Sequence, residues 1–269
     1  MSSAKLLAVI TGASSGIGHE LAKQFAQHGF DLVISSHSQS PAEVTQALER
    51  LGAHVESVQV DLSTPQGVET LYQKIQATGR PVDAIAINAG MGLGGDFAEQ
   101  TDLQDEIKLI NLNVVSTVHL AKLVVKDMVA RGSGRILFTS SIAARLPGAF
   151  QAVYNGSKAF VQSFAEAIRN ELKDTGVSVT ALQPGPTDTN FFHRAGMDDT
   201  NVGAGPKDDP AQVAKQGFEA LMAGKDHVVG GSLGTKLQAA VSSVLPETAK
   251  AEQHRGRAEP GSGHQKPSG

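Results

Sequence analysis

Short apolar runs alternate with longer amphipathic segments along most of the chain. The runs are rich in Val, Ile, Leu and Ala, which predicts buried β-strands. They lie at Leu6–Thr11, Asp31–Ser35, Val55–Val60, Ala84–Asn88, Arg135–Ser140 and Val177–Leu182. Between them, apolar residues recur at helical spacing, which predicts helices at Gly18–His28, Pro41–Gly52, Pro65–Thr78, Leu103–Arg131 and Tyr154–Thr175.

This regular strand–helix alternation is typical of a parallel sheet with helices on both faces. A further helix near Pro210–Ala223 and a strand near His227–Gly230 would complete the sheet. Because crossover connections are right-handed, we predict an α/β fold with a single Rossmann-type doubly wound parallel sheet of about seven strands.

The periodicity divides the chain into one domain at residues 1–246 and a short remainder. Within the domain, residues 186–209 lose the pattern and place Gly, Asp, Thr and Asn around Phe191 and Phe192. We interpret this segment as a substrate lid, and an uninvolved surface loop is the alternative. Residues 247–269 are polar and end in a Gly/Pro-rich stretch, which predicts a disordered tail.

Composition narrows the function classes. The chain has 269 residues, 40% of them hydrophobic, and a net charge of -4, which gives no reason to expect nucleic acid as a partner. No run approaches the ~18 apolar residues of a membrane span, and the first strand begins too early for a signal peptide. The absence of cysteine fits the cytoplasm. No histidine pair has metal-ligand spacing with carboxylate support, so no metal site is expected.

A glycine-rich turn follows the first predicted strand. Gly12, Gly16 and Gly18 would let the backbone turn tightly and approach a ligand that a Cβ atom would repel. The helix that begins there presents free N–H groups and a positive dipole end, which favour a pyrophosphate. The turn therefore predicts nucleotide binding.

Tyr154 and Lys158 lie four residues apart on one predicted helix, and Ser141 lies thirteen positions before Tyr154. Carbonyl reduction needs a positioned acid, and a lysine on the same helical face favours the tyrosinate by its charge. Ser141 could donate to the substrate oxygen as negative charge develops. A surface pair on an amphipathic helix is the alternative for Tyr154 and Lys158. His193 in the lid and Arg145 after the fifth strand could contact a substrate, but both are more simply interpreted as ordinary residues, Arg145 as a solvent-facing one.

These motifs together resemble the short-chain dehydrogenase/reductase family, in its ordinary, non-extended branch. Thr11-Gly12-x-x-x-Gly16-x-Gly18 is similar to the family's cofactor motif, Asn88-Ala89-Gly90 to its Asn-Ala-Gly element, and Pro184-Gly185 with Thr189 to its motif after strand six. Asn113, Ser141, Tyr154 and Lys158 match its catalytic tetrad in order and spacing. The family's distance to the serine favours Asn113 over Asn111.

The resemblance implies roles for these residues. Tyr154 would be the general acid/base, Lys158 would also hold the nicotinamide ribose, and Asn113 would anchor a proton-relay water. Asp61 would contact the adenine, and Thr189 would hold the carboxamide. The resemblance also implies a homodimer or homotetramer. The full predicted cofactor set is Gly12, Ser14, Gly16, Ile17, Gly18, Ser36, His37, Ser38, Asp61, Leu62, Asn88, Ala89, Gly90, Tyr154, Lys158, Pro184, Gly185, Thr187 and Thr189.

The end of the second strand bears on the choice of cofactor. An acidic residue there would bind the ribose 2′-hydroxyl of NAD, and a basic one would accept the 2′-phosphate of NADP. Here the sequence offers Ser36, His37 and Ser38, which could donate to a phosphate. We therefore expect NADP(H) to be preferred, with NAD(H) as the alternative.

We thus predict an NAD(P)-dependent oxidoreductase that interconverts a ketone or aldehyde and an alcohol by hydride transfer. A catalytically idle NAD(P)-binding sensor or scaffold is one alternative, although its tetrad would be broken. A nucleotide-sugar epimerase or dehydratase is another. That class differs in its glycine spacing and usually carries a larger C-terminal domain.

Overall fold

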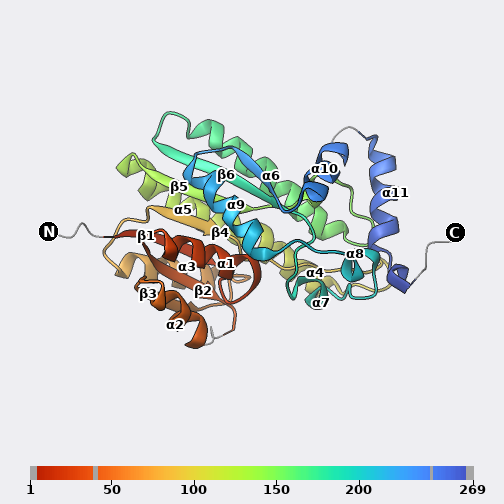
Figure 1. Ribbon diagram of the computed structural model, residues 1–269, viewed down its shortest axis with the longest axis horizontal. Helices are drawn as coiled ribbons and strands as arrows, with labels where there is room; N and C mark the ends of the chain where they lie inside the picture. Colours follow the sequence, from red (N-terminus) through yellow and green to blue (C-terminus); the bar gives the residue numbers. More distant parts are fainter. Residues whose placement is uncertain (1–4, 39–41, 243–244, 265–269) are drawn as a thin grey trace.

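A seven-stranded parallel sheet forms the centre of the molecule in the computed structural model, which describes residues 5–38, 42–242 and 245–264 (Figure 1). The strand order is β3-β2-β1-β4-β5-β6-β7. The strands are β1 (Leu6–Thr11), β2 (Phe30–Ser36), β3 (Val55–Gln59), β4 (Ala84–Ile87), β5 (Gly134–Thr139), β6 (Val177–Pro184) and β7 (His227–Gly230). The predicted doubly wound fold is confirmed.

Helices cover both faces of this sheet (Figure 1). The long helices are α1 (Gly16–Gln27), α2 (Ala42–Arg50), α3 (Pro65–Ala77), α4 (Leu103–Ile110), α5 (Ser116–Arg131), α6 (Ala152–Glu171), α9 (Pro210–Met222), α10 (Leu233–Ser242) and α11 (Glu247–Ala258). Two single turns, α7 (Phe191–Arg194) and α8 (Asn201–Ala204), lie in the predicted lid. Short 3₁₀ turns occupy Ile142–Arg145 and Ser262–His264.

Each face of the sheet has its own apolar core. Along β1 the side chains alternate, so that Leu7 and Val9 join one core and Ala8 and Ile10 the other. The first core packs against α3, α5 and α6, and the second against α1, α2 and α9. Because β1 is buried on both sides, its sequence is a continuous apolar run rather than an alternating one.

The predicted helix over 103–131 is divided in the structure. A π-helical segment, Asn111–Val115, separates α4 from α5. By length and composition alone, Leu103–Arg131 could cross a membrane, contrary to the expectation from the sequence. Leu120, Val124 and Met128 of this stretch are buried in the core under α5, and 39% of its most apolar window is buried.

The prediction of a disordered tail is wrong for the part of the chain that the structure describes. Residues 247–258 form α11, and a 3₁₀ turn follows at Ser262–His264. Lys250, His254 and Ala258 recur at helical spacing and are buried, so this polar helix docks along one narrow stripe. Its dipole is matched by Glu247 in the first turn and by basic residues in the last. Residues 265–269 lie outside the described part of the chain.

If α11 is docked, its backbone amides exchange slowly with solvent. We expect the amides of residues 251–258 to exchange at least about 10-fold more slowly than in an unstructured peptide. Ala258→Asp, which places a carboxylate in an apolar contact, should remove that protection. Hydrogen–deuterium exchange with peptide-level mass spectrometry measures both. Exchange of the wild-type segment at the unstructured rate would contradict the docked helix.

Candidate active site

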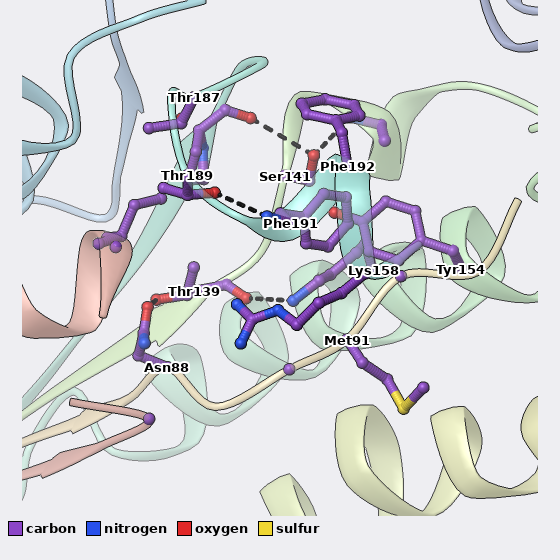
Figure 2. Close-up of a pocket in the computed structure, with 18 of the residues that line it drawn as sticks. Asn88, Met91, Thr139, Ser141, Tyr154, Lys158, Thr187, Thr189, Phe191 and Phe192 are labelled. Carbon is purple, nitrogen blue, oxygen red and sulfur yellow. Dashed lines mark hydrogen bonds between the residues drawn. The ribbon is translucent and has the colours of Figure 1, made fainter. Parts of the chain in front are cut away.

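A cavity of about 610 Å³ runs along the carboxyl edge of the sheet, where the winding reverses between β1 and β4. Every residue that the sequence predicted to contact the cofactor lines it. Of the predicted tetrad, Ser141, Tyr154 and Lys158 line it as well, while Asn113 lies behind the wall. The fold therefore brings both groups of sequence motifs to one site (Figure 2).

In the glycine turn between β1 and α1, backbone segments pack directly against one another. Gly12 and Gly16 have φ angles of 70° and 58°, which favour glycine. A Cβ atom on Gly18 would lie 2.2 Å from the carbonyl oxygen of Gly12 and 2.5 Å from Nδ2 of Asn88. This leaves a side-chain-free surface at the N-terminus of a twelve-residue helix. Its bare N–H groups and positive dipole end fit a pyrophosphate.

Side-chain hydrogen bonds hold the ends of β1, β4 and β5 together behind this turn. Oγ1 of Thr11 accepts from the backbone N–H groups of Asn88 and Ala89, both at 2.9 Å. Nδ2 of Asn88 donates to the carbonyl oxygen of Thr11 at 3.1 Å, and Oγ1 of Thr139 donates to Oδ1 of Asn88 at 3.0 Å. Thr11 and Asn88 thus position the strand ends from which the cavity is built.

The far end of the cavity is lined by the residues after β2 and β3. Ser36 is buried, and its hydroxyl donates to the carbonyl oxygen of Ser38 at 2.6 Å. His37 is exposed, with Nε2 3.7 Å from Oδ2 of Asp61. Hydrogen bonds from Ser63 outweigh burial and lower the pKa of Asp61. This end therefore offers hydroxyl and imidazole groups beside one carboxylate.

Tyr154 lies in the first turn of α6, and only 8% of its surface is exposed. Burial raises the pKa of its phenol to about 12, and a hydrogen bond with Ser141 opposes that shift in part. Ser141 caps the 3₁₀ turn after β5: its hydroxyl accepts from the N–H of Ala143 at 3.1 Å and donates to the carbonyl oxygen of Pro184 at 3.4 Å. The phenol is thus neutral at physiological pH and could donate a proton to a bound oxygen.

Lys158 lies one turn further along α6, on the same face as Tyr154. Its Nζ donates to the carbonyl oxygen of Thr139 at 2.9 Å and lies 5.9 Å from the centre of the tyrosine ring. Burial lowers the pKa of Lys158 to about 8. Burial therefore disfavours the protonated, charged form of Lys158. Burial is the largest cause of the pKa shift of both Lys158 and Tyr154.

Asn113 lies in the π-helical segment and is 1% exposed. Its side chain donates to the carbonyl oxygen of Met91 and accepts from the N–H of the same residue, at 2.9 and 3.0 Å. It also donates to the hydroxyl of Ser157 at 3.0 Å, which in turn donates to the carbonyl oxygen of Tyr154 at 2.7 Å. Asn113 thereby positions the loop after β4 against the helix that carries Tyr154.

The segment at 186–209, predicted as a lid, supplies an apolar wall beside Tyr154. The Phe191 ring lies 5.3 Å from the Tyr154 ring, and Phe192 packs edge-on against Phe191 (Figure 2).

His193 and Arg145, the two polar residues considered for substrate contact, do not belong to this wall. His193 is exposed and pairs with Asp198 at 2.7 Å, and neither His193 nor Arg145 lines the cavity.

Sequence reasoning missed the part of the wall that α11 provides. Gln253, His254, Arg257 and Ala258 line the cavity, together with Gln238 of α10 and Arg194 of α7. An acidic first turn and a basic last turn around Glu247–Ala258 were the signals that could have revealed this helix. Within the described residues, no group of three or more His, Cys, Asp or Glu side chains could hold a metal ion.

The sheet topology and this site define an α/β nucleotide-binding oxidoreductase. The family model described as "short chain dehydrogenase" matches residues 6–199, and the chain belongs to that family. It is 32% identical over 250 residues to the ketoacyl reductase HetN of Nostoc sp. The aligned region covers 88% of this chain and 84% of that protein. It is 30% identical to the NADP-dependent 3-hydroxy acid dehydrogenase YdfG of Salmonella typhi, covering 67% of this chain and 72% of that protein.

Solved structures agree with the fold. A short-chain dehydrogenase from Sphingobium yanoikuyae in complex with NADPH has a TM-score of 0.78 at 27% identity and covers 90% of this chain and 96% of that chain. A putative NAD(P)-dependent gluconate 5-dehydrogenase from Beutenbergia cavernae with bound NADP has a TM-score of 0.72 at 28% identity, covering 85% and 96%.

The crowding at Gly18 predicts the effect of adding a methyl group there. Gly18→Ala should displace the backbone of the glycine turn, weaken NADPH binding at least about 10-fold and destabilise the fold by about 1–3 kcal/mol. NADPH fluorescence titration and thermal unfolding measure the two effects. Gly156→Ala is the matched control, because a Cβ on that exposed α6 glycine would meet nothing within 4 Å. Equal behaviour of the two variants would show that the turn is not close-packed.

Proposed function

We propose that this protein is an NADP(H)-preferring oxidoreductase that interconverts a ketone or aldehyde and an alcohol, with Tyr154 as general acid/base. The observation that carries the proposal is the convergence of Ser141, Tyr154 and Lys158 on the same cavity as the glycine turn. When bound, the cofactor supplies the hydride. The chain supplies its binding surface and the proton.

Two hydroxyl groups face the position where a carbonyl oxygen would be reduced. The neutral Tyr154 phenol donates its proton to that oxygen, and Ser141 donates a hydrogen bond as negative charge develops on it. In the reverse direction, Tyr154 must take a proton from the alcohol. Positive charge nearby then opposes the burial that raises its pKa, and Lys158 on the same helical face is placed to provide it.

The surroundings of these groups support the assignment. Asn113 and Lys158 both approach Gly90, since a Cβ there would lie 3.2 Å from Oδ1 of the asparagine and 3.3 Å from Nζ of the lysine. The Asn88–Gly90 loop, the lysine and the asparagine therefore form one packed unit beside Tyr154. Phe191 closes the other side of the phenol ring and limits its access to bulk water.

The proposed preference for NADP(H) rests on the end of β2. Ser36 and Ser38 are hydroxyl-bearing, and His37 is exposed at the cavity rim. No aspartate or glutamate occupies the end of β2 or the two described residues that follow it. A relative whose name specifies NADP, and two solved structures that hold NADPH or NADP, support the same choice.

A homo-oligomer formed through α4, α5 and α6 is part of the proposal. Apolar side chains are exposed along these helices, and burying them against a second copy would remove them from water. They are Leu103, Ile107, Ile110, Val115, Val129 and Phe160.

The cytoplasmic location inferred from the lack of cysteine stays a prediction.

Removing the proposed acid should abolish reduction while leaving the cavity intact. Tyr154→Phe is expected to lower kcat for carbonyl reduction at least about 100-fold, because no other group would donate the proton. The assay follows loss of NADPH absorbance over small, aromatic and acidic carbonyl compounds. Tyr72→Phe is the matched control: this is the only other tyrosine, and its hydroxyl bonds Asp127 on the helical surface. Undiminished turnover by Tyr154→Phe would refute the assigned role.

A carboxylate at the end of β2 should reverse the cofactor preference. Ser36→Asp is expected to raise the ratio of kcat/KM for NADH over NADPH at least about 10-fold, because the new charge repels a 2′-phosphate and accepts from a 2′-hydroxyl. Ser36→Ala separates this effect from simple loss of the serine hydroxyl. A wild-type enzyme that already used NADH better would show that Ser36–Ser38 do not select NADP.

A further inference from the structure

The substrate end of the cavity carries two arginines that the proposed reaction does not use. Arg257 lies in the last turn of α11 and Arg194 in the lid turn α7, and both line the cavity. Arg194 lies within the region that the family model matches, residues 6–199, and Arg257 lies after it.

Specific contacts hold α11 against the lid. Nδ2 of Asn201 donates to the carbonyl oxygen of Gly256 at 2.8 Å, and the N–H of Gly261 donates to Oδ2 of Asp199 at 2.8 Å. Ala258 is buried in one apolar cluster with Phe192. Figure 1 shows α11 beside α8 at the end of the molecule opposite the N-terminus. These contacts fix α11 against the lid, and α11 in turn holds Arg257 in the cavity wall.

The wall next to Arg257 connects directly to the reaction centre. Ala258 packs with Phe192, Phe192 packs on Phe191, and the Phe191 ring lies against Tyr154. One turn before Ala258 on α11, Nδ1 of His254 donates to the carbonyl oxygen of Ala149, in the loop that leads into α6. Arg257 and Tyr154 thus line one cavity, with Phe191 and Phe192 in the wall between α11 and the tyrosine.

Neither arginine has an acidic partner within the described residues. Asp61 is the only carboxylate among the described cavity residues, and it lies at the opposite, nucleotide end beside His37. No described side chain forms an ion pair or a hydrogen bond with either guanidinium, while the neighbouring Arg255 is paired with Glu259. Arg257 is half-buried, and burial lowers its pKa.

His254 does not supply the missing counter-charge. It is buried, and desolvation lowers its pKa, so the imidazole is neutral at physiological pH. Arg194 and Arg257 are the cations that line this end of the cavity; Lys207, whose Nζ lies 5.4 Å from the centre of the Phe192 ring, is not among the lining residues. A partly desolvated cation without a partner is costly, and a bound anion would offset that cost. Guanidinium groups recognise carboxylates through paired, parallel hydrogen bonds.

We propose that the substrate of this enzyme is a carbonyl compound that carries a carboxylate, which Arg257 binds with the help of Arg194 while the carbonyl lies at Tyr154. The apolar wall of Phe191 and Phe192 then contacts the carbon chain between the two groups. This inference rests on the proposed reductase function and adds the substrate class to it.

The test compares acids with their esters. Reduction of 3-, 4-, 5- and 6-carbon oxo acids and of their methyl esters is followed with NADPH and the full chain. We expect kcat/KM of the wild type to favour the acid at least about 10-fold at the best chain length. Arg257→Gln should lower that acid-to-ester ratio about 10-fold or more, and Arg257→Lys should restore part of it. Equal ratios in the wild type and Arg257→Gln would overturn the proposal.

Two further variants keep the result interpretable. Lys236→Gln removes one exposed positive charge from α10 outside the cavity and should leave the ratio unchanged. Arg194→Gln alters an exposed side chain, so it tests the same site even if Arg257→Gln fails to fold, and it should also lower the ratio. An unchanged ratio in Arg194→Gln together with an unfolded Arg257→Gln would count against the site.

NADPH fluorescence titration separates substrate binding from cofactor binding. We expect Arg257→Gln to bind NADPH within about twofold of the wild type. A loss of NADPH affinity as large as the loss of acid turnover would assign Arg257 to the cofactor and overturn the proposal. Failure of the proposed function looks different: no carbonyl would be reduced, or Tyr154→Phe would reduce acids and esters as well as the wild type does.

Discussion

The hydroxyl of Thr11 accepts hydrogen bonds from two successive backbone amides, those of Asn88 and Ala89, and so ties the carboxyl end of β1 to that of β4. These are the two strands between which the sheet reverses its winding. At such a point the loops of neighbouring strands diverge and leave a crevice. The glycine turn leaves β1 on one side of this crevice, and the loop that contacts Asn113 leaves β4 on the other. The position of the whole site follows from this junction.

Burial sets the electrostatics of Tyr154 and Lys158, the two groups proposed to act in catalysis. Tyr154 and Lys158 are both removed from water, which raises the pKa of the phenol and lowers that of the ammonium, so that each is pushed toward its neutral form. A neutral phenol is the form that donates a proton in reduction. If Tyr154 acts in the oxidation direction, it needs positive charge nearby, and Lys158 is the cation whose Nζ lies 5.9 Å from the centre of its ring.

The two walls of the cavity are made from different kinds of structural element. The nucleotide side uses backbone, strand ends and short polar side chains, whereas the opposite wall is made from a lid and a C-terminal helix that hold each other. Asn201 and Asp199 of the lid bond the backbone of the C-terminal segment, and the apolar residues of both pack together. Because this wall lies outside the sheet, it can differ between relatives without disturbing the fold.

The sequence alone was sufficient for the sheet and for the two motif groups. Buried parallel strands are continuous apolar runs, and the glycine turn has a steric signature that needs no tertiary information, as the close approach of Gly18 to Gly12 illustrates. Right-handed crossovers favoured a doubly wound sheet, and the structure supplies the order of its strands. The placement of Ser141 beside Tyr154 was anticipated from the family's spacing rather than from periodicity.

Tertiary structure decided the rest. The polar stretch Glu247–Ala258 buries too little apolar surface to be ordered by its own composition, and it is a helix here because His254 and Ala258 find partners in the loop before α6 and in the lid. The sequence likewise favoured one uninterrupted helix over 103–131, while the structure places a π-helical turn where Asn113 bonds Met91 and Ser157. The sign of the pKa shift of Tyr154 also depends on burial. Each of these outcomes depends on contacts between residues far apart in the chain, which local patterns do not encode.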